Sequence, residues 1–166
     1  GITAALTLDP TALPAMVNPV WPVHYTAAVR NGLDNTPVGS VPTDAMAALG
    51  RVLFHDRQLS TTRTVSCASC HGAAVGFTDP ARLSVGVAAP TTTTAHSMRL
   101  GNARFGRGVG FFWDRRAASL EAQSTQPIED VAEHGFSAAA GGLAAVHARM
   151  QTLAYYPELF RLAYGD

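Results

Sequence analysis

The chain has 166 residues and a formal net charge of zero, with twelve basic and twelve acidic side chains. This balance provides no electrostatic attraction to nucleic acid or to an anionic membrane surface, so we expect neither as a partner. No apolar run is long enough for a transmembrane segment. The length is sufficient for a hydrophobic core and predicts one domain or one and a half.

Residues 1–42 are rich in proline and show little hydrophobic periodicity. Because proline and glycine interrupt regular structure, this composition predicts an irregular N-terminal arm over residues 1–42. Trp21 and Tyr25 are the large aromatic side chains of this segment, and we expect them to anchor the arm by packing.

The first helix is predicted over residues 43–55, directly after Pro42. Thr43 or Asp44 can cap its beginning, and apolar residues recur at helical spacing through Leu49 and Leu53. A polar turn over residues 56–64 then leads into the most informative stretch of the chain.

That stretch is Cys67-Ala68-Ser69-Cys70-His71, which contains the only two cysteines. C-x-x-C-H is the attachment motif of a c-type haem, in which two thiols bond to the vinyl groups of the porphyrin. The adjacent histidine then gives the iron an axial nitrogen ligand. We therefore expect Cys67 and Cys70 to attach one haem c and His71 to bind its iron.

Three other uses of these cysteines are less well supported. A zinc site needs two further ligands at matching spacing, and a thioredoxin-like site needs a βαβ pattern, and neither is found. A disulfide across two intervening residues is rare. Because haem is attached covalently outside the bacterial cytoplasm, the motif predicts a periplasmic or cell-surface protein whose first residue is a processed or truncated start.

The remaining chain predicts loops and three further helices. Loops are expected at residues 72–94 and 101–110, where Gly and Pro recur. A second helix is predicted from after Asp114 to residue 123 or 124, with Pro127 ending it. The third and last helices are expected over residues 137–153 and from residues 156–157 to Gly165. No period-2 segment is found, so the class is all-α with long loops.

A series of short segments resembles, in order, the bacterial di-haem cytochrome c peroxidases and their MauG-like relatives. The series covers about three-quarters of the chain and consists of residues 49–54, 56, 59–60, 66–71, 77–79, 84–86, 102–105, 112–117, 119–123, 127–128, 133 and 156–160. Each match is weak alone, and the ordered series is specific.

The resemblance implies a fold and a partner. That family has two cytochrome c-like domains with one haem each; peroxide reacts at the N-terminal haem, and the other receives electrons from an outside donor. Residues 43–166 resemble the N-terminal domain only, and no second C-x-x-C-H follows. We therefore expect a cytochrome c-like helical domain around one covalent haem c, working with a second haem-bearing domain or chain.

The same resemblance implies roles for three side chains. Glu133 matches the family's distal acid–base carboxylate, and Gln123 matches a nearby amide that orients peroxide. Trp113 matches a tryptophan that relays electrons between the haems. From the residues alone, Glu133 would instead be a surface carboxylate beside Glu129 and Asp130, and Trp113 would pack in the core.

The sequence also departs from the family. Classical members carry a distal histidine shortly after a Ser-x-Gly, but Val87 follows Ser84-Val85-Gly86 here, which implies an iron open to peroxide. His96 stands near the position where the family usually has an asparagine associated with an interdomain calcium ion. A histidine there weakens the expectation of a calcium site, because calcium prefers oxygen ligands. His96 or Met98 could bind the iron as a sixth ligand, although each is more often a plain loop residue. Three histidines are interpreted as ordinary surface or packing residues: His24, His134 and His147.

Two functions follow. The first is the peroxide-reactive half of a peroxidase or MauG-like oxidase, which reduces hydrogen peroxide with electrons from a cytochrome or cupredoxin, or uses it to oxidise a protein substrate. The second is a mono-haem electron carrier without catalysis, with His/Met or His/His ligation of the iron and Met98 or Met150 as the candidate second ligand. A haem-based sensor or binding module is a third, weaker hypothesis.

Overall fold

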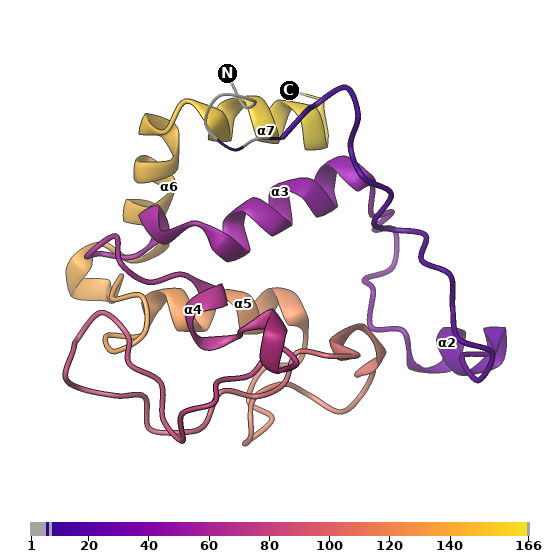
Figure 1. Ribbon diagram of the computed structural model, residues 1–166, viewed down its shortest axis with the longest axis horizontal. Helices are drawn as coiled ribbons and strands as arrows, with labels where there is room; N and C mark the ends of the chain where they lie inside the picture. The colour runs from indigo at the N-terminus through magenta and orange to yellow at the C-terminus, as the bar shows by residue number, and fades with distance from the viewer. Residues whose placement is uncertain (1–5, 7, 166) are drawn as a thin grey trace.

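The computed structural model describes residue 6 and residues 8–165; residues 1–5 and 7 of the expected arm, and residue 166, lie outside the described residues. The described part is helical, with no strand and only three isolated β-bridges. This confirms the all-α class with long loops (Figure 1). None of the described helices combines the length and the apolar composition that a bilayer span requires.

Three helices organise the hydrophobic core: α3 (Asp44–His55), α6 (Gly142–Thr152) and α7 (Tyr155–Tyr164). In Figure 1, α3 lies beside α7, and α6 leads into α7 through a short turn. The buried cluster consists of Leu49, Leu59, Phe136, Val146, Tyr156 and Leu159. Burial of one such apolar side chain contributes roughly 1.5–3 kcal/mol, so this cluster accounts for much of the stability of the fold.

The first helix is confirmed at both ends. Thr43 caps α3, because its Oγ1 atom accepts a 3.2 Å hydrogen bond from the amide of Met46. Asp44 follows in the first turn, where a negative charge is favourable. Its Oδ1 atom also accepts hydrogen bonds of 2.7 and 3.0 Å from the amides of Met16 and Val17, so the start of α3 holds this part of the arm.

The arm is not irregular throughout, because it contains helix α2 (Ala27–Leu33), which the sequence analysis missed. Thr26 caps this helix by accepting a hydrogen bond from the amide three residues on. The expected anchoring is confirmed: the rings of Trp21 and Tyr25 lie 5.6 and 5.4 Å from the ring of Phe105. The arm is thus fixed to a loop of the main body.

The predicted limits of the second helix are wrong at both ends. Helix α5 spans Leu120–Glu129, and its cap is Ser119 rather than Asp114. The residues between Asp114 and Ser119 are not helical, because Ala117 pairs in an isolated β-bridge with residue 111. Pro127 lies inside the last turn of α5 instead of ending it. At this position a proline removes one hydrogen bond near the helix end, which the helix tolerates.

The third helix also starts later than predicted. Gly141 has a left-handed backbone with φ of +92°, so residues 138–140 form a separate 3-10 turn and α6 begins at Gly142. The end of α7 at Gly165 is confirmed, with φ of +95°. Because α7 begins at Tyr155, Pro157 occupies its third position, where the missing amide hydrogen still has no partner within the helix.

The loops are concentrated in one half of the molecule. Helix α4 (Cys67–Cys70) is followed by residues 71–118, in which the only helical pieces are two 3-10 turns, η2 (Ala73–Val75) and η3 (Ala103–Phe105). The described residues with positive φ other than glycine are Arg63, Phe77, Asn102, Phe112 and Arg115. Irregular backbone of this kind is typical of functional regions supported by a rigid scaffold.

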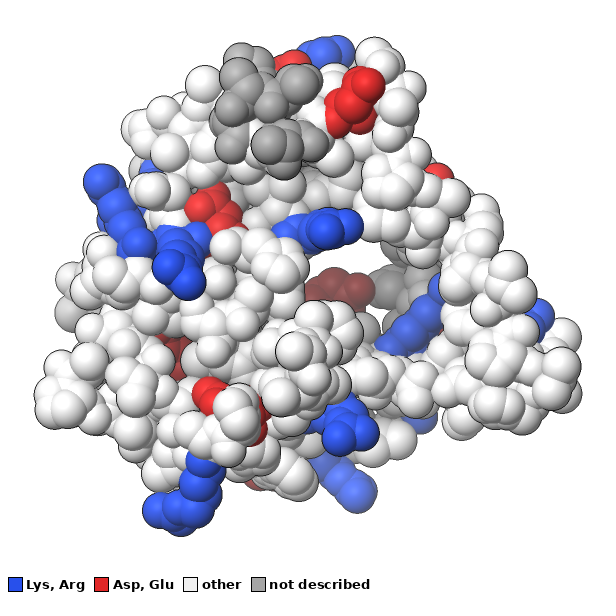
Figure 2. All heavy atoms as spheres, in the orientation of Figure 1, with Lys and Arg blue, Asp and Glu red and all other residues white. Residues whose placement is uncertain are grey.

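The charged side chains on the surface are dispersed. Figure 2 shows basic and acidic side chains scattered over one face rather than gathered into a patch of one sign. The arm bounds a hollow of about 620 Å³, lined on the arm side by residues 16–19, 21, 36 and 41–42 and on the other side by Arg104.

Candidate functional site

The two cysteines lie on the short helix α4, three positions apart and therefore on the same side of it. Ser66 and Ser69 form a reciprocal cap at its start, which fixes the direction of the helix. Both thiols are unpaired and partly buried. Burial raises the pKa of the Cys67 thiol to about 11 and also raises the pKa of Cys70.

His71 ends α4, and its ring is oriented by the next loop. Its Nδ1 atom lies 3.0 Å from the carbonyl oxygen of Phe77. Because a carbonyl only accepts, Nδ1 carries the hydrogen, and the lone pair of Nε2 is left available for a metal. The positive φ of Phe77 is part of the turn that aims this carbonyl. These residues fit a c-type haem: two free thiols on one side of a helix and an adjacent imidazole whose Nδ1 atom is held by a carbonyl oxygen, which leaves Nε2 to face a metal.

Glu133 is partly buried in the turn that follows α5. Its amide donates a 3.1 Å hydrogen bond to Oδ1 of Asp130, and its carbonyl oxygen accepts one of 3.1 Å from the amide of Val87. Burial raises the pKa of the Glu133 carboxyl, the charge of Asp130 raises it further, and Arg116 opposes both. The carboxylate is close enough to the thiols that its charge adds to the raised pKa of Cys67 and of Cys70.

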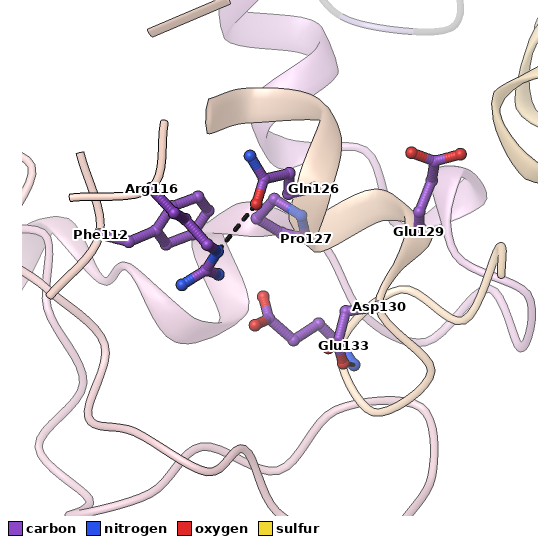
Figure 3. A pocket seen from close by; sticks show the side chains of 7 residues that line it. All are labelled: Phe112, Arg116, Gln126, Pro127, Glu129, Asp130 and Glu133. Atoms are coloured by element: carbon purple, nitrogen blue, oxygen red, sulfur yellow. Dashed lines mark hydrogen bonds between the residues drawn. The ribbon is translucent and has the colours of Figure 1, made fainter. Parts of the chain in front are cut away.

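A pocket of about 330 Å³ opens beside this carboxyl group. Figure 3 shows the side chain of Glu133 extended toward Arg116, whereas Glu129 points away from it. The guanidinium of Arg116 lies 3.6 Å from the ring centroid of Phe112 and donates a 2.9 Å hydrogen bond to Oε1 of Gln126. The lining residues are Phe112, Arg116, Gln126, Pro127, Glu129, Asp130 and Glu133.

Gln126, rather than Gln123, lines this pocket. Gln123 lies one turn earlier on α5, on the same face as Pro127, and is partly buried. Sequence reasoning missed Gln126 and Arg116. The helical spacing from Gln123 could have indicated Gln126, but the contact of Arg116 depends on a loop that has no local sequence signal.

Trp113 lies on the surface, with 64% of its area exposed. Its Nε1 atom donates a 2.8 Å hydrogen bond to the carbonyl oxygen of His96, which fixes the orientation of the indole. Trp113 is therefore not a core residue, and the packing interpretation of this side chain is wrong.

His96 is held by the loop around it. Its Nε2 atom lies 3.1 Å from Oγ1 of Thr78, and its Nδ1 atom lies 3.1 and 3.2 Å from the carbonyl oxygens of Ala81 and Arg82. Both ring nitrogens have polar partners, so the structure does not present His96 as an iron ligand. Among the described residues there is also no group of three His, Cys, Asp or Glu side chains placed to hold a metal ion.

His134 is a residue whose position sequence reasoning did not foresee. The sequence analysis predicts an ordinary surface or packing histidine; the side chain is buried, with 4% exposed, and its Nε2 atom lies 3.9 Å from Sγ of Cys67. No local pattern indicates this contact, because the two residues are 67 positions apart.

Comparison with known proteins gives consistent matches. A family model described as di-haem cytochrome c peroxidase matches residues 44–166. Methylamine utilization protein MauG of Methylorubrum extorquens is 35% identical over 133 residues, covering 78% of this chain and 35% of the relative. Cytochrome c peroxidase Ccp of Escherichia coli is 39% identical over 98 residues, covering 56% of this chain and 20% of the relative.

Solved structures resemble the fold. A MauG-like protein associated with microbial copper homeostasis superimposes with a TM-score of 0.69 at 29% identity, over 80% of this chain and 37% of that chain. The diheme peroxidase BthA from Burkholderia thailandensis gives a TM-score of 0.65 at 25% identity, over 80% and 35%. The chain thus spans about a third of the length of these proteins.

Proposed function

Because the chain belongs to the di-haem cytochrome c peroxidase family, we propose that residues 43–166 form the haem domain in which hydrogen peroxide reacts, with residues 1–42 as an arm outside it. The cofactor of the family is haem c. The chain covers 35% of the length of its MauG relative, so the activity of a complete two-haem protein is part of the proposal.

The observation that carries this proposal is the position of Glu133. A fully exposed carboxyl group would keep its ordinary pKa. Burial and the charge of Asp130 raise the pKa of the Glu133 carboxyl. A raised pKa brings the group nearer the range in which it both takes and returns a proton. Its charge also acts on both thiols, so it lies on the side of the fold where a haem would be attached.

Haem iron, when bound through Nε2 of His71, supplies the centre at which peroxide binds and is reduced. Glu133 would take a proton from the bound peroxide oxygen and give it to the departing oxygen. The amide of Gln123 would orient peroxide, and Arg116 and Gln126 supply polar groups at the edge of the pocket. Two electrons and two further protons complete the reduction of one peroxide to two waters.

Trp113 is proposed to pass those electrons inward from a second haem-bearing domain or chain. An electron relay between two domains must lie at their contact surface, and the exposed indole meets this requirement. Its hydrogen bond to the carbonyl of His96 would keep the ring in one orientation.

We further propose one haem in this chain, a periplasmic or otherwise exported location, and a cytochrome or cupredoxin as electron donor, or a protein substrate that is oxidised. An interdomain calcium ion is the weakest of these proposals, since His96 supplies nitrogen where oxygen is preferred. The electron-carrier alternative fits less well, because the family model that matches the chain is that of a peroxidase and cytochrome c peroxidases are among its relatives.

The test uses the matured protein together with its second haem domain or partner. Glu133→Gln keeps the size of the side chain and removes its acid–base function, so the peroxide reaction measured by stopped flow should slow by about 10²- to 10⁴-fold. The Soret spectrum should stay the same. Glu129→Gln is the control, because Glu129 lies on the same pocket but points away (Figure 3). Equal rates for Glu133→Gln and the unmodified protein would refute the assignment.

A further inference from the structure

Two neighbouring tyrosines share a single carboxylate oxygen. Oδ2 of Asp56, the residue that follows α3, accepts hydrogen bonds of 2.7 Å from the hydroxyls of both Tyr155 and Tyr156 at the start of α7. The centroids of the two rings lie 4.7 Å apart. The peroxide chemistry proposed above uses none of these three residues.

The pair leads from the interior of the domain to its surface. Tyr156 is 1% exposed, whereas Tyr155 is half-buried. Helix α4, which carries Cys67, packs against α3. Tyr156 is also close enough to Cys67 for a charge on the sulfur to raise the pKa of its hydroxyl, after the larger effects of burial and of Asp56. Because Cys67 is a proposed attachment point of haem, the buried member of the pair lies beside the haem site.

Tyrosine gives up an electron readily only where its proton has an acceptor. Burial and the hydrogen bond to Asp56 raise the pKa of both hydroxyls, so both stay protonated in the resting protein. A phenol that has lost an electron is instead a strong acid, and a carboxylate oxygen at 2.7 Å is within reach of its proton. The same contact thus keeps the resting tyrosine neutral and receives the proton of the oxidised one.

We propose that Tyr156 and Tyr155 form a path along which an oxidising equivalent leaves the haem site for the surface, with Asp56 as the proton acceptor. The proposal rests on the proposed function, because the oxidant is haem that peroxide has oxidised. In the first step Tyr156 gives one electron to that haem and its hydroxyl proton to Oδ2 of Asp56.

The second step moves the radical outward. Tyr155 gives one electron to the Tyr156 radical and its own proton to Oδ2, while Oδ2 returns the first proton to Tyr156. The sum is oxidation of Tyr155 by one electron and reduction of the haem by one electron. One acceptor atom can serve both steps because both hydroxyls donate to it. At Tyr155 an outside reductant can then supply an electron when none arrives from a second haem.

Tyr25 provides the contrast within the same chain. Its hydroxyl also donates a hydrogen bond, of 2.8 Å, but the acceptor is the amide oxygen of Asn102, which is a far weaker base than a carboxylate. Tyr25→Phe therefore removes a hydrogen-bonded tyrosine without removing a proton acceptor, and it serves as the matched control.

The experiment detects the radical directly. The matured full chain with its haem is mixed with hydrogen peroxide in the absence of a reduced donor, frozen within milliseconds to seconds, and measured by EPR. Parallel samples contain ring-deuterated tyrosine, which narrows the signal of a tyrosine radical. The variants are Tyr156→Phe, Tyr155→Phe, Asp56→Asn and Tyr25→Phe, and the Soret spectrum of each resting variant reports whether the haem site is intact.

We expect a signal that narrows on deuteration, is lost in Tyr156→Phe and is unchanged in Tyr25→Phe. Tyr155→Phe should keep a tyrosine signal with a different line shape, because the radical then stays on Tyr156. Asp56→Asn should lower the yield of the radical by about tenfold or more. Because Asp56→Asn also weakens the fold, Tyr156→Phe is the decisive variant: it keeps the buried ring and removes one hydroxyl.

A signal that does not narrow, or one that survives unchanged in Tyr156→Phe, would overturn the proposal. Loss of the signal in Tyr155→Phe with retention in Tyr156→Phe would also overturn it, since the order of the path would be wrong. If peroxide leaves the Soret spectrum of the unmodified protein unchanged, the proposed function itself fails. A Soret change without any tyrosine signal overturns this inference alone, so the two failures are distinguishable.

Discussion

Gly86 lies so close to Ala132 that a Cβ atom on residue 86 would overlap the carbonyl oxygen of Ala132. The next residue, Val87, donates its amide to the carbonyl of Glu133. These two contacts press one loop against the turn that carries the proposed acid–base group. The position of Glu133 therefore depends on the absence of a side chain one loop away.

Gly86→Ala is expected to push the two loops apart, because the overlap is with backbone that has no rotamer to change. Overpacking of this kind costs about 1–3 kcal/mol, so thermal unfolding followed by circular dichroism should occur several degrees lower. Gly50→Ala is the matched control: it lies in α3 with nothing within 4 Å of an added Cβ, and it should stabilise the helix by about 0.5–1 kcal/mol. The same melting temperature for both variants would contradict the steric argument.

The raised pKa of Glu133 predicts how stability depends on pH. The charged carboxylate is disfavoured in the folded protein, so the stabilisation is complete below the ordinary pKa of 4.5 and is lost as pH rises through the higher folded-state value. Glu133→Gln removes this loss. Denaturant unfolding at pH 4 and pH 8 should show the variant gaining stability relative to the unmodified protein at the higher pH.

Asp130→Asn tests the electrostatic part of that shift, because burial raises the pKa of Glu133 most and the charge of Asp130 raises it further. In this variant the folded-state pKa of Glu133 should be lower, so the pH-dependent loss of stability should end at a lower pH and be smaller. If the difference in unfolding free energy between the unmodified protein and Glu133→Gln does not change with pH, the carboxyl group of Glu133 has an ordinary environment.

Trp113→Phe removes the indole and its hydrogen bond to His96 from the surface. Because the side chain is 64% exposed, we expect a change in stability within about 1 kcal/mol. Peroxide binding should be unaffected, whereas steady-state turnover with a reduced donor should fall in the complete two-haem protein. Tyr164→Phe, a change at another exposed aromatic residue, is the control. Unaltered turnover in Trp113→Phe would leave the residue without a relay role.

Asp56 accepts hydrogen bonds of 2.7 Å from the hydroxyls of both Tyr155 and Tyr156 at the same Oδ2 atom. Its other oxygen caps the following 3-10 turn through the amide of Gln58. Asp56→Asn should weaken all three contacts and lower the free energy of unfolding by about 2–4 kcal/mol, measured with denaturant. Tyr155→Phe removes one contact only, so it should cost about 1 kcal/mol. A loss in Tyr155→Phe as large as in Asp56→Asn would contradict the shared-acceptor arrangement.

Because Val87 stands where classical members of the family have a distal histidine, we expect no histidine from this loop on the iron. The resting ferric protein should show a high-spin component by EPR, and Val87→His should convert part of it to a low-spin form by supplying an imidazole near that position. A purely low-spin spectrum in the unmodified protein would mean that another residue binds the iron.

The sequence predicts a helix boundary correctly where the cap or stop chemistry of a single residue determines it. Thr43 at the start of α3 and Gly165 after α7 have the cap and stop chemistry that their structures use. The haem motif was identifiable for the same reason, since all its residues are adjacent in sequence. The sequence predicts the start of α5 too early, after Asp114, because the bridge between Ala117 and residue 111 keeps this stretch out of the helix and Ser119 provides the cap.

The environment of His134 could not be read from the sequence at all. It depends on a turn at Leu59 meeting the end of α5, at a separation of 75 residues. Glu133 was assigned through a resemblance, because its neighbours Glu129 and Asp130 made it look like one more surface charge. Its burial follows from the loop at Val87, which no periodicity indicates.

The arm contacts the rest of the molecule at three places along its length. Leu8 packs against the core cluster. The amides of Met16 and Val17 donate to Asp44 at the start of α3, and Trp21 packs against Phe105 in the loop region. Both cysteines belong to the proposed haem-attachment motif, so no other cysteine of the chain is available for a disulfide. These contacts are apolar packing and hydrogen bonds, so they do not depend on the redox state of the surroundings. In a domain proposed to react with peroxide, an arm held in this way stays in place in the presence of oxidants and reductants.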